Sequence, residues 1–283
     1  MLDPKLHHTP EISFRTIGRH RLRIAHWRAR SDTPGPPLLF FTGIGASFEL
    51  LFPFLELLEG RDVVTFDVPG IGGSERPRWP YRPRNVAAAG ERIMRELGFD
   101  GEIDVMGASW GGMIAQQFAH QYASRTRSLI LAATAAGIVM VPGKLSALKE
   151  MMRPRRHVDP SYMIRHKQQI YGGRTDCLAT IYSQTLPPTR IGYLFQLLAI
   201  SGWTSAWFLR FLQARTLILT GGEDNLVPVA NGKLLKRMIP DARLHVVDDG
   251  GHLFLLTHGD DMAAEVERFL DAPEPEPRPA PGA

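Results

Sequence analysis

Hydrophobic and polar residues alternate with a period of two in two segments near the start of the chain, residues 12–17 and 22–27. Successive side chains of a β-strand point to opposite faces, so this pattern is typical of strands with one buried face. We therefore expect the chain to open with an antiparallel pair of strands.

After these segments, short apolar runs alternate with helical patterns. The apolar runs that predict buried strands are residues 38–42, 63–67, 103–107, 129–132, 217–221 and 244–247. The helical patterns cover residues 86–97, 113–122 and 262–270. Strands and helices in alternation favour a parallel sheet with helices on both faces. With the opening pair, the chain predicts an α/β fold around a mostly parallel, eight-stranded sheet.

The alternation lapses between residues 133 and 213, where Met, Trp, Tyr, Arg and Pro become frequent. Helical fragments are expected there at residues 162–170 and 194–212. We interpret residues 134–213 as a helical cap, or lid, inserted after the sixth strand. The domain organisation that follows is a core made of residues 1–133 and 214–271, with the cap between its two parts.

The composition is that of an ordinary globular protein, with 44% hydrophobic and 22% charged residues in a chain of 283. The net charge of +4 comes from scattered basic residues, with one short cluster at Arg153, Arg155 and Arg156. A solvated face explains this cluster better than a nucleic-acid site does, so no nucleic-acid partner is expected.

The ends of the chain and its single cysteine suggest a location. Cys177 has no partner for an internal disulfide, and residues 1–8 lack a charged segment followed by an apolar run. Both features predict a cytoplasmic protein. The longest apolar stretch, residues 129–141, is too short to span a bilayer. Residues 272–283 carry Pro at every second position from 273 to 281, which predicts a disordered tail.

The strongest chemical signal is the G-x-S-x-G motif formed by Gly107, Ser109 and Gly111. It comes directly after the expected strand at residues 103–107 and directly before a helical pattern. In this setting the glycines permit a sharp turn that exposes the serine hydroxyl at the carboxyl end of the sheet. Ser109 is therefore the predicted nucleophile.

A serine hydroxyl needs a base and an orienting carboxylate to act as a nucleophile. The G-x-S-x-G turn in this setting predicts an α/β-hydrolase fold, in which the chain order is Ser, then Asp, then His. Asp224 follows the strand at residues 217–221, and strand-end position favours it over the rival acids Glu223, Asp248 and Asp249. Of the ten histidines, His252 is the best placed, because it lies in a loop between a strand and the last helix.

An ester hydrolase must also stabilise an oxyanion, which this fold does with two backbone N–H groups. The residue after the nucleophile is Trp110, and the loop after the third strand supplies Ile44, which lies between Gly43 and Gly45. A dinucleotide-binding loop is a poor alternative, because Phe48 stands where the third glycine of that motif belongs. The chemistry requires no cofactor and no metal.

Several longer segments resemble the intracellular medium-chain-length polyhydroxyalkanoate depolymerases of bacteria that store polyester granules. The matching segments are Phe41-Thr-Gly-Ile-Gly-Ala-Ser, Phe66-Asp-Val-Pro-Gly-Ile-Gly-Gly-Ser, Ser109-Trp-Gly-Gly, Ile200-Ser-Gly-Trp-Thr-Ser and Gly251-His-Leu-Phe-Leu. They extend into the cap, where hydrolase families diverge most. One departure is Thr42, where that family carries Asn.

The resemblance implies a Ser109, Asp224 and His252 triad, a cap over an apolar cleft, and a polyester substrate met at a granule surface. The cap residues that we expect to line the acyl cleft, beside Gly43 of the oxyanion loop, are Met140, Leu194, Trp203, Trp207 and Phe208. The simpler interpretation of these side chains is packing of the cap against the sheet.

Two other functions remain open. The same triad serves a general carboxylesterase acting on medium-chain acyl esters, and the fold also suits a catalytically silent granule-binding protein. A polyester synthase uses cysteine at the elbow, and dehalogenases and epoxide hydrolases use a carboxylate, so Ser109 argues against all three.

Overall fold

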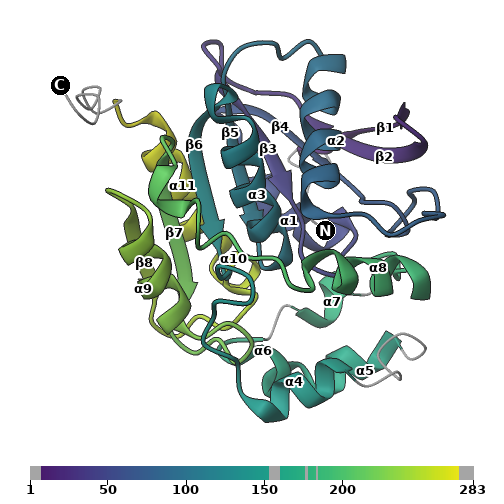
Figure 1. Cartoon of the computed structure of the whole chain (residues 1–283), viewed down its shortest axis with the longest axis vertical. Helices are drawn as coiled ribbons and strands as arrows, with labels where there is room; N and C mark the ends of the chain where they lie inside the picture. Colours follow the sequence, from purple (N-terminus) through teal and green to yellow (C-terminus); the bar gives the residue numbers. More distant parts are fainter. Residues whose placement is uncertain (1–7, 153–159, 176–177, 183, 274–283) are drawn as a thin grey trace, which may run out of the picture.

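The computed structural model describes residues 8–152, 160–175, 178–182 and 184–273. The predicted tail beyond residue 273, Cys177 and the cluster at Arg153, Arg155 and Arg156 lie outside these residues. Eight strands form one sheet in the order β1-β2-β4-β3-β5-β6-β7-β8 (Figure 1). The predicted eight-stranded, mostly parallel sheet is confirmed.

The opening pair is β1 (Glu11–Ile17) and β2 (His20–Trp27), which are antiparallel to each other. Strand β2 also pairs antiparallel with β4 (Arg61–Phe66). The remaining pairings are parallel. The other strands are β3 (Gly35–Phe41), β5 (Ile103–Ala108), β6 (Thr126–Ala132), β7 (Arg215–Gly221) and β8 (Arg243–Val247).

Helices cover both faces of the sheet because its central strands are apolar on both sides. In β3, Leu39 and Phe41 face one buried cluster while Leu38 and Phe40 face the other. The first face carries α2 (Pro83–Glu96), α3 (Trp110–Gln121) and α9 (Val229–Met238), and the second carries α1 (Phe52–Leu55), α10 (Phe254–Thr257) and α11 (Gly259–Asp271). Single-turn helices are η1 (Phe48–Leu51) and η2 (Ala123–Arg125).

Between β6 and β7 the chain forms a group of helices that lies below the sheet in Figure 1. These elements are α4 (Leu145–Met152), α5 (Pro160–Arg165), α6 (Lys167–Tyr171), α7 (Leu178–Tyr182), α8 (Arg190–Ile200) and η4 (Leu209–Phe211). They begin where the parallel strands end, at the edge of the sheet that carries the functional loops in this fold class. We call residues 134–213 the cap insertion.

Two helices expected in the cap insertion have other boundaries. The segment at 162–170 is divided into α5 and α6, which meet at His166. The helix expected over 194–212 begins earlier, at Arg190 after its N-cap Thr189, and ends at Ile200. It ends there because Ser201 is extended and Gly202 has a φ of 72°, outside the helical region. The prediction of a helix up to residue 212 was wrong because the apolar residues after Ile200 do not continue the helix.

Candidate active site

Ser109 lies on the sharp turn between β5 and α3. Its φ of 55° and ψ of −119° are strained for a residue with a side chain. The neighbouring glycines allow the turn, because a Cβ at Gly107 would come within 2.2 Å of the Gly111 carbonyl oxygen. Two hydrogen bonds fix the backbone: the Ser109 N–H donates to Ala132 O at 2.8 Å, and the Thr134 hydroxyl donates to Ser109 O at 2.7 Å.

The three residues predicted for catalysis form one chain of hydrogen bonds. His252 Nε2 lies 3.0 Å from Ser109 Oγ, and His252 Nδ1 lies 2.8 Å from Asp224 Oδ2. An ionised carboxylate only accepts hydrogen bonds, so the imidazole proton belongs on Nδ1 and Nε2 is left as an acceptor for the serine hydroxyl. This arrangement is suited to removing the proton from Ser109 during nucleophilic attack.

Strand ends bring these side chains together. Asp224 comes from the loop after β7 and His252 from the loop after β8, and both strands run parallel to β5. The second carboxylate oxygen of Asp224 accepts the N–H groups of Leu226 and Val227, each at 2.8 Å. The carboxylate is therefore fixed in direction and has a side chain shielded from solvent.

The rival acids do not reach the imidazole. Glu223 and Asp248 are exposed, and Asp249 pairs with His258 at 3.0 Å. In the part of the chain that the structure describes, no group of three His, Cys, Asp or Glu side chains is placed to hold a metal ion.

The loop after β3 lies against the nucleophile. A Cβ at Gly43 would be 3.7 Å from the Cβ of Ser109. The Thr42 hydroxyl donates to Ala46 O at 3.2 Å, and the Ala46 N–H donates to Gly43 O at 3.3 Å, so the loop is closed on itself. Thr42 thus supports the loop where the resembling family has Asn.

Comparison with known proteins identifies the family. The sequence profile of the alpha/beta hydrolase fold matches residues 36–170. The chain is 48% identical over 255 residues to the poly(3-hydroxyalkanoate) depolymerase of Ectopseudomonas oleovorans, covering 87% of this chain and 89% of that protein. The chain belongs to the poly(3-hydroxyalkanoate) depolymerase family. It is a serine ester hydrolase of the α/β-hydrolase fold.

More distant relatives share the fold. A 2-hydroxymuconate semialdehyde hydrolase of Pseudomonas putida is 27% identical over 87% of this chain and 85% of its own length. Among solved structures, an esterase from Exiguobacterium antarcticum superposes with a TM-score of 0.77 at 17% identity, covering 92% of this chain and 99% of that chain. No helix within the described ranges is long and apolar enough to cross a bilayer.

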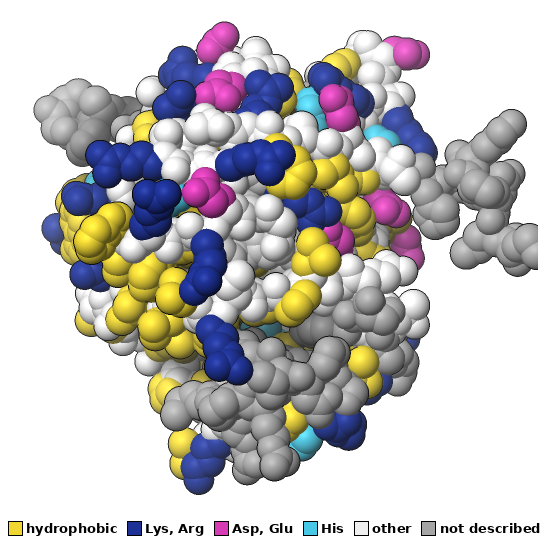
Figure 2. Space-filling view, turned by 90° about the vertical axis from the view of Figure 1, so that its right-hand side faces the viewer, with side chains coloured by type: hydrophobic (Ala, Val, Ile, Leu, Met, Phe, Trp, Pro, Cys, Tyr) yellow, Lys and Arg dark blue, Asp and Glu magenta, His cyan; other side chains and the backbone are white. Residues whose placement is uncertain are grey.

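This depolymerase-family chain places the five expected cleft residues in different surroundings. Leu194 is half-exposed on α8, and Met140 is partly buried in the loop after β6. Hydrophobic side chains are exposed in several groups on the face of the molecule that Figure 2 shows. The Trp203 indole donates to Gln117 Oε1 at 3.0 Å, so its polar end ties the cap insertion to α3. Because Leu194 and Met140 are only partly buried, both side chains are able to contact a substrate.

Trp207 and Phe208 lie at the far end of α3. Both rings contact the ring of His120, with centroid separations of 5.0 and 4.3 Å. His120 is eleven residues after Ser109, which is about 16 Å along a helix. Phe208 is buried and Trp207 is exposed, so these two side chains form a packed edge of the cap insertion that is remote from the nucleophile.

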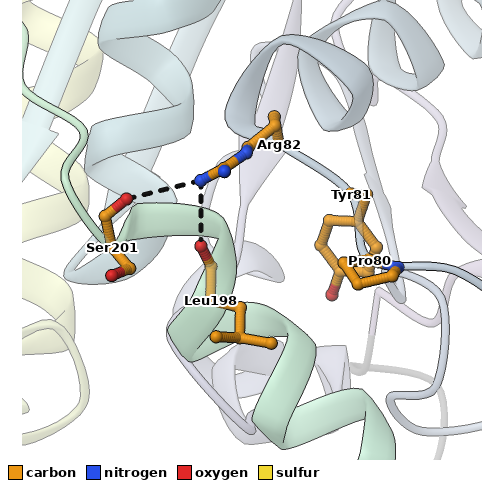
Figure 3. A pocket seen from close by; sticks show the side chains of 5 residues that line it. All are labelled: Pro80, Tyr81, Arg82, Leu198 and Ser201. Atoms are coloured by element: carbon orange, nitrogen blue, oxygen red, sulfur yellow. Dashed lines mark hydrogen bonds between the residues drawn. The ribbon is translucent and has the colours of Figure 1, made fainter.

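A surface cavity of about 250 Å³ lies where α8 meets the core, and its lining does not include Ser109, Asp224 or His252. Its lining residues are Pro80, Tyr81, Arg82, Leu198 and Ser201 (Figure 3). Inside it Arg82 donates to the carbonyl oxygens of Leu198 and Ser201, both at 3.3 Å. Arg82 thus caps the carboxyl end of α8. We therefore interpret the cavity as part of the structural contact between α8 and the core.

Sequence reasoning missed four residues that support the site. Thr134 holds the backbone of Ser109 through its hydroxyl group. Tyr171 O accepts the N–H of His252 at 2.8 Å, and its ring lies parallel to the imidazole. Asn225 donates to two carbonyl oxygens of α6. The fourth is Gln196, which contacts the loop after β3. None belongs to a motif, because each acts through contacts distant in sequence.

Proposed function

We propose that this chain hydrolyses the ester bonds of medium-chain-length poly(3-hydroxyalkanoate) through a Ser109, His252 and Asp224 triad. The hydrogen-bonded chain from Ser109 to Asp224 carries the proposal. The 48% identity to a poly(3-hydroxyalkanoate) depolymerase supports the polyester substrate.

The mechanism is acyl transfer in two halves. Ser109 Oγ attacks the ester carbonyl while His252 Nε2 takes its proton, and the protonated imidazole then gives that proton to the departing alkoxide. The product is a 3-hydroxyacyl ester of Ser109 and a shortened polymer with a free hydroxyl. Water then attacks the acyl-enzyme with His252 as base, releasing the acid and restoring Ser109. Asp224 orients the imidazole and stabilises its charged form.

The oxyanion of each tetrahedral intermediate is stabilised by the backbone N–H groups of Ile44 and Trp110. Within the described residues neither group donates a hydrogen bond to the protein, so both are available. Gly43 keeps this loop close to the nucleophile without a side chain in the way.

The cap insertion selects the acyl chain. Leu194 and Met140 supply apolar surface that does not belong to the buried clusters, and medium-length side chains of the polyester would cover it. We further propose that the enzyme works at the surface of polyester granules, where such a water-insoluble substrate is met.

The test is release of 3-hydroxyacids from suspensions of poly(3-hydroxyoctanoate) and poly(3-hydroxybutyrate), with Ser109→Ala as the control. We expect release from the medium-chain polymer by the wild type alone. Hydrolysis of small soluble esters without release from either polymer would instead indicate a general carboxylesterase. Binding to the polymer with no hydrolysis of any ester would indicate a silent granule-binding protein.

A further inference from the structure

Helix α8 of the cap insertion is anchored to the core at both ends. At its start, the N–H and hydroxyl of Thr189 donate to Gly70 O at 3.0 and 2.9 Å. At its end, the Arg82 guanidinium holds two carbonyl oxygens, as Figure 3 shows. The helix backbone also touches the core, since a Cβ at Gly70 would come within 2.6 Å of the Gly192 Cα. The middle of α8 is therefore held at a fixed distance from the core.

Gln196 lies between these two anchors and is fully buried. Its side-chain oxygen accepts the N–H of Gly45 at 2.7 Å, and its backbone oxygen accepts the indole N–H of Trp110 at 3.0 Å. Gly45 directly follows Ile44. One residue of the cap insertion thus contacts the neighbour of Ile44 and the side chain of Trp110, the two residues proposed to supply the oxyanion-hole donors.

The chemistry of the amide group explains why glutamine stands here. Because Gly45 offers a donor, the side-chain oxygen must face it, which fixes the orientation of the amide. Gln196 Nε2 is buried and has no hydrogen-bond partner among the residues that the structure describes. An apolar side chain of the same size would avoid that unfavourable burial, so the bond to Gly45 is the feature that calls for a polar residue.

We propose that Gln196 is a positioning residue that holds both oxyanion-hole donors in place. Its amide oxygen restrains Gly45 and thereby the N–H of Ile44, while its backbone oxygen restrains the ring of Trp110. The proposal rests on the Ser109 mechanism above, and it makes the cap insertion part of the catalytic machinery as well as a substrate filter.

Such positioning acts mainly on the transition state. Oxyanion-hole donors are effective when they already point at the site where charge develops, and removal of one donor lowers kcat by about 10²- to 10³-fold. A displaced donor retains part of its effect. The neutral ester of the ground state depends less on these groups, so a positioning defect lowers kcat more than it raises KM.

The experiment compares Gln196→Met with Gln117→Met. Methionine matches glutamine in size and lacks a strong acceptor. Gln117 is the matched control, because its amide oxygen also accepts an N–H across the cap–core boundary, from Trp203 at 3.0 Å. The probes are the soluble substrate 4-nitrophenyl octanoate and an octyl trifluoromethyl ketone, whose adduct with Ser109 carries an oxyanion.

For Gln196→Met we expect kcat to fall roughly 10- to 100-fold with little change in KM, and the ketone inhibition constant to rise by the same factor. Gln117→Met should keep the wild-type values of kcat, KM and the ketone inhibition constant. If the two variants behave alike, the inference is wrong. Ser109→Ala separates the two claims, since its inactivity leaves the proposed function standing, whereas wild-type turnover in that variant overturns the proposed function itself.

A second variant covers the case in which Gln196→Met does not fold, as judged by circular dichroism. Trp110→Phe removes the bond to the Gln196 backbone oxygen while keeping the backbone N–H of residue 110. A lower kcat with a matching rise in the ketone inhibition constant is expected, and unchanged values of both would overturn the inference.

Discussion

The catalytic loops and the cap insertion are held in place by different means. Ser109, Asp224 and His252 each follow a strand of one sheet, so strand pairing alone brings them to the same edge. The cap insertion shares a small apolar cluster with Leu226 in the loop after β7 and leaves several leucines of α8 half-exposed. It reaches the core through hydrogen bonds to loops and through apolar side chains, such as Phe208 and Leu209, that pack in the cluster shared with α2 and α3. The sheet therefore positions the three side chains proposed for catalysis, whereas the cap insertion is proposed to select the acyl chain and, through Gln196, to hold the oxyanion-hole donors.

The largest effect is expected from Ser109→Ala. Loss of the nucleophile should reduce ester hydrolysis to a residual level of roughly 10³- to 10⁴-fold over water, by analogy with serine proteases. The measurement is kcat/KM for esters of several chain lengths. The loss should be equal for all of them, because the change lies in the catalytic loops; a loss confined to long chains would contradict this division of roles.

Asp224→Asn should lower kcat by about 10⁴, again by analogy with serine proteases, because an amide favours the wrong imidazole tautomer. Glu223→Gln is the matched control, since it neutralises the adjacent exposed carboxylate. We expect that variant to stay close to wild type. The reverse ranking in steady-state assays would reassign the orienting acid.

Changes in the half-exposed cap residues proposed to contact the acyl chain should alter chain-length preference without removing activity. Four more buried methylenes are worth about 3 kcal/mol, so octanoate esters should exceed butanoate esters by on the order of a hundredfold in kcat/KM. Leu194→Ala should reduce that ratio about fivefold, as expected for a half-exposed leucine.

Trp207→Ala is the control for this change, because Trp207 contacts His120 at the far end of α3. It should leave the ratio unchanged. A larger effect from Trp207 than from Leu194 would place the acyl cleft elsewhere in the cap insertion.

The smallest effect on turnover is expected at Asp67, where a change acts on the stability of the protein. Burial raises the pKa of Asp67 to about 7, although the N–H groups of Phe48 and Gly73 partly stabilise its charged form. Between about pH 4 and pH 7 the folded protein then binds more protons than the unfolded chain, so the free energy of unfolding falls as pH rises through this window.

Asp67→Asn removes this titrating group. In urea unfolding at pH 4.5 and 7.5, the variant should show a smaller fall in unfolding free energy than the wild type. An equal fall in both proteins would contradict the assignment to Asp67.

Particular residues show what the sequence could predict. The strands follow from local rules, because each is a short apolar run. The proximity of Ser109, His252 and Asp224 also follows from local signals, namely the G-x-S-x-G turn and the positions of the other two residues after later strands. The end of α8 at Ile200 and the positions of Trp207 and Phe208 do not, since tertiary contacts decide them. Gln196 was missed for the same reason: its partner Gly45 is 151 residues away in the chain.

The most direct test of the central claim is covalent labelling of the nucleophile with a fluorophosphonate. We predict a single label, found by mass spectrometry on the peptide that contains Ser109, and loss of polyester hydrolysis in proportion to the labelled fraction. A label on another residue, or a fully labelled enzyme that still releases 3-hydroxyacids, would contradict the account.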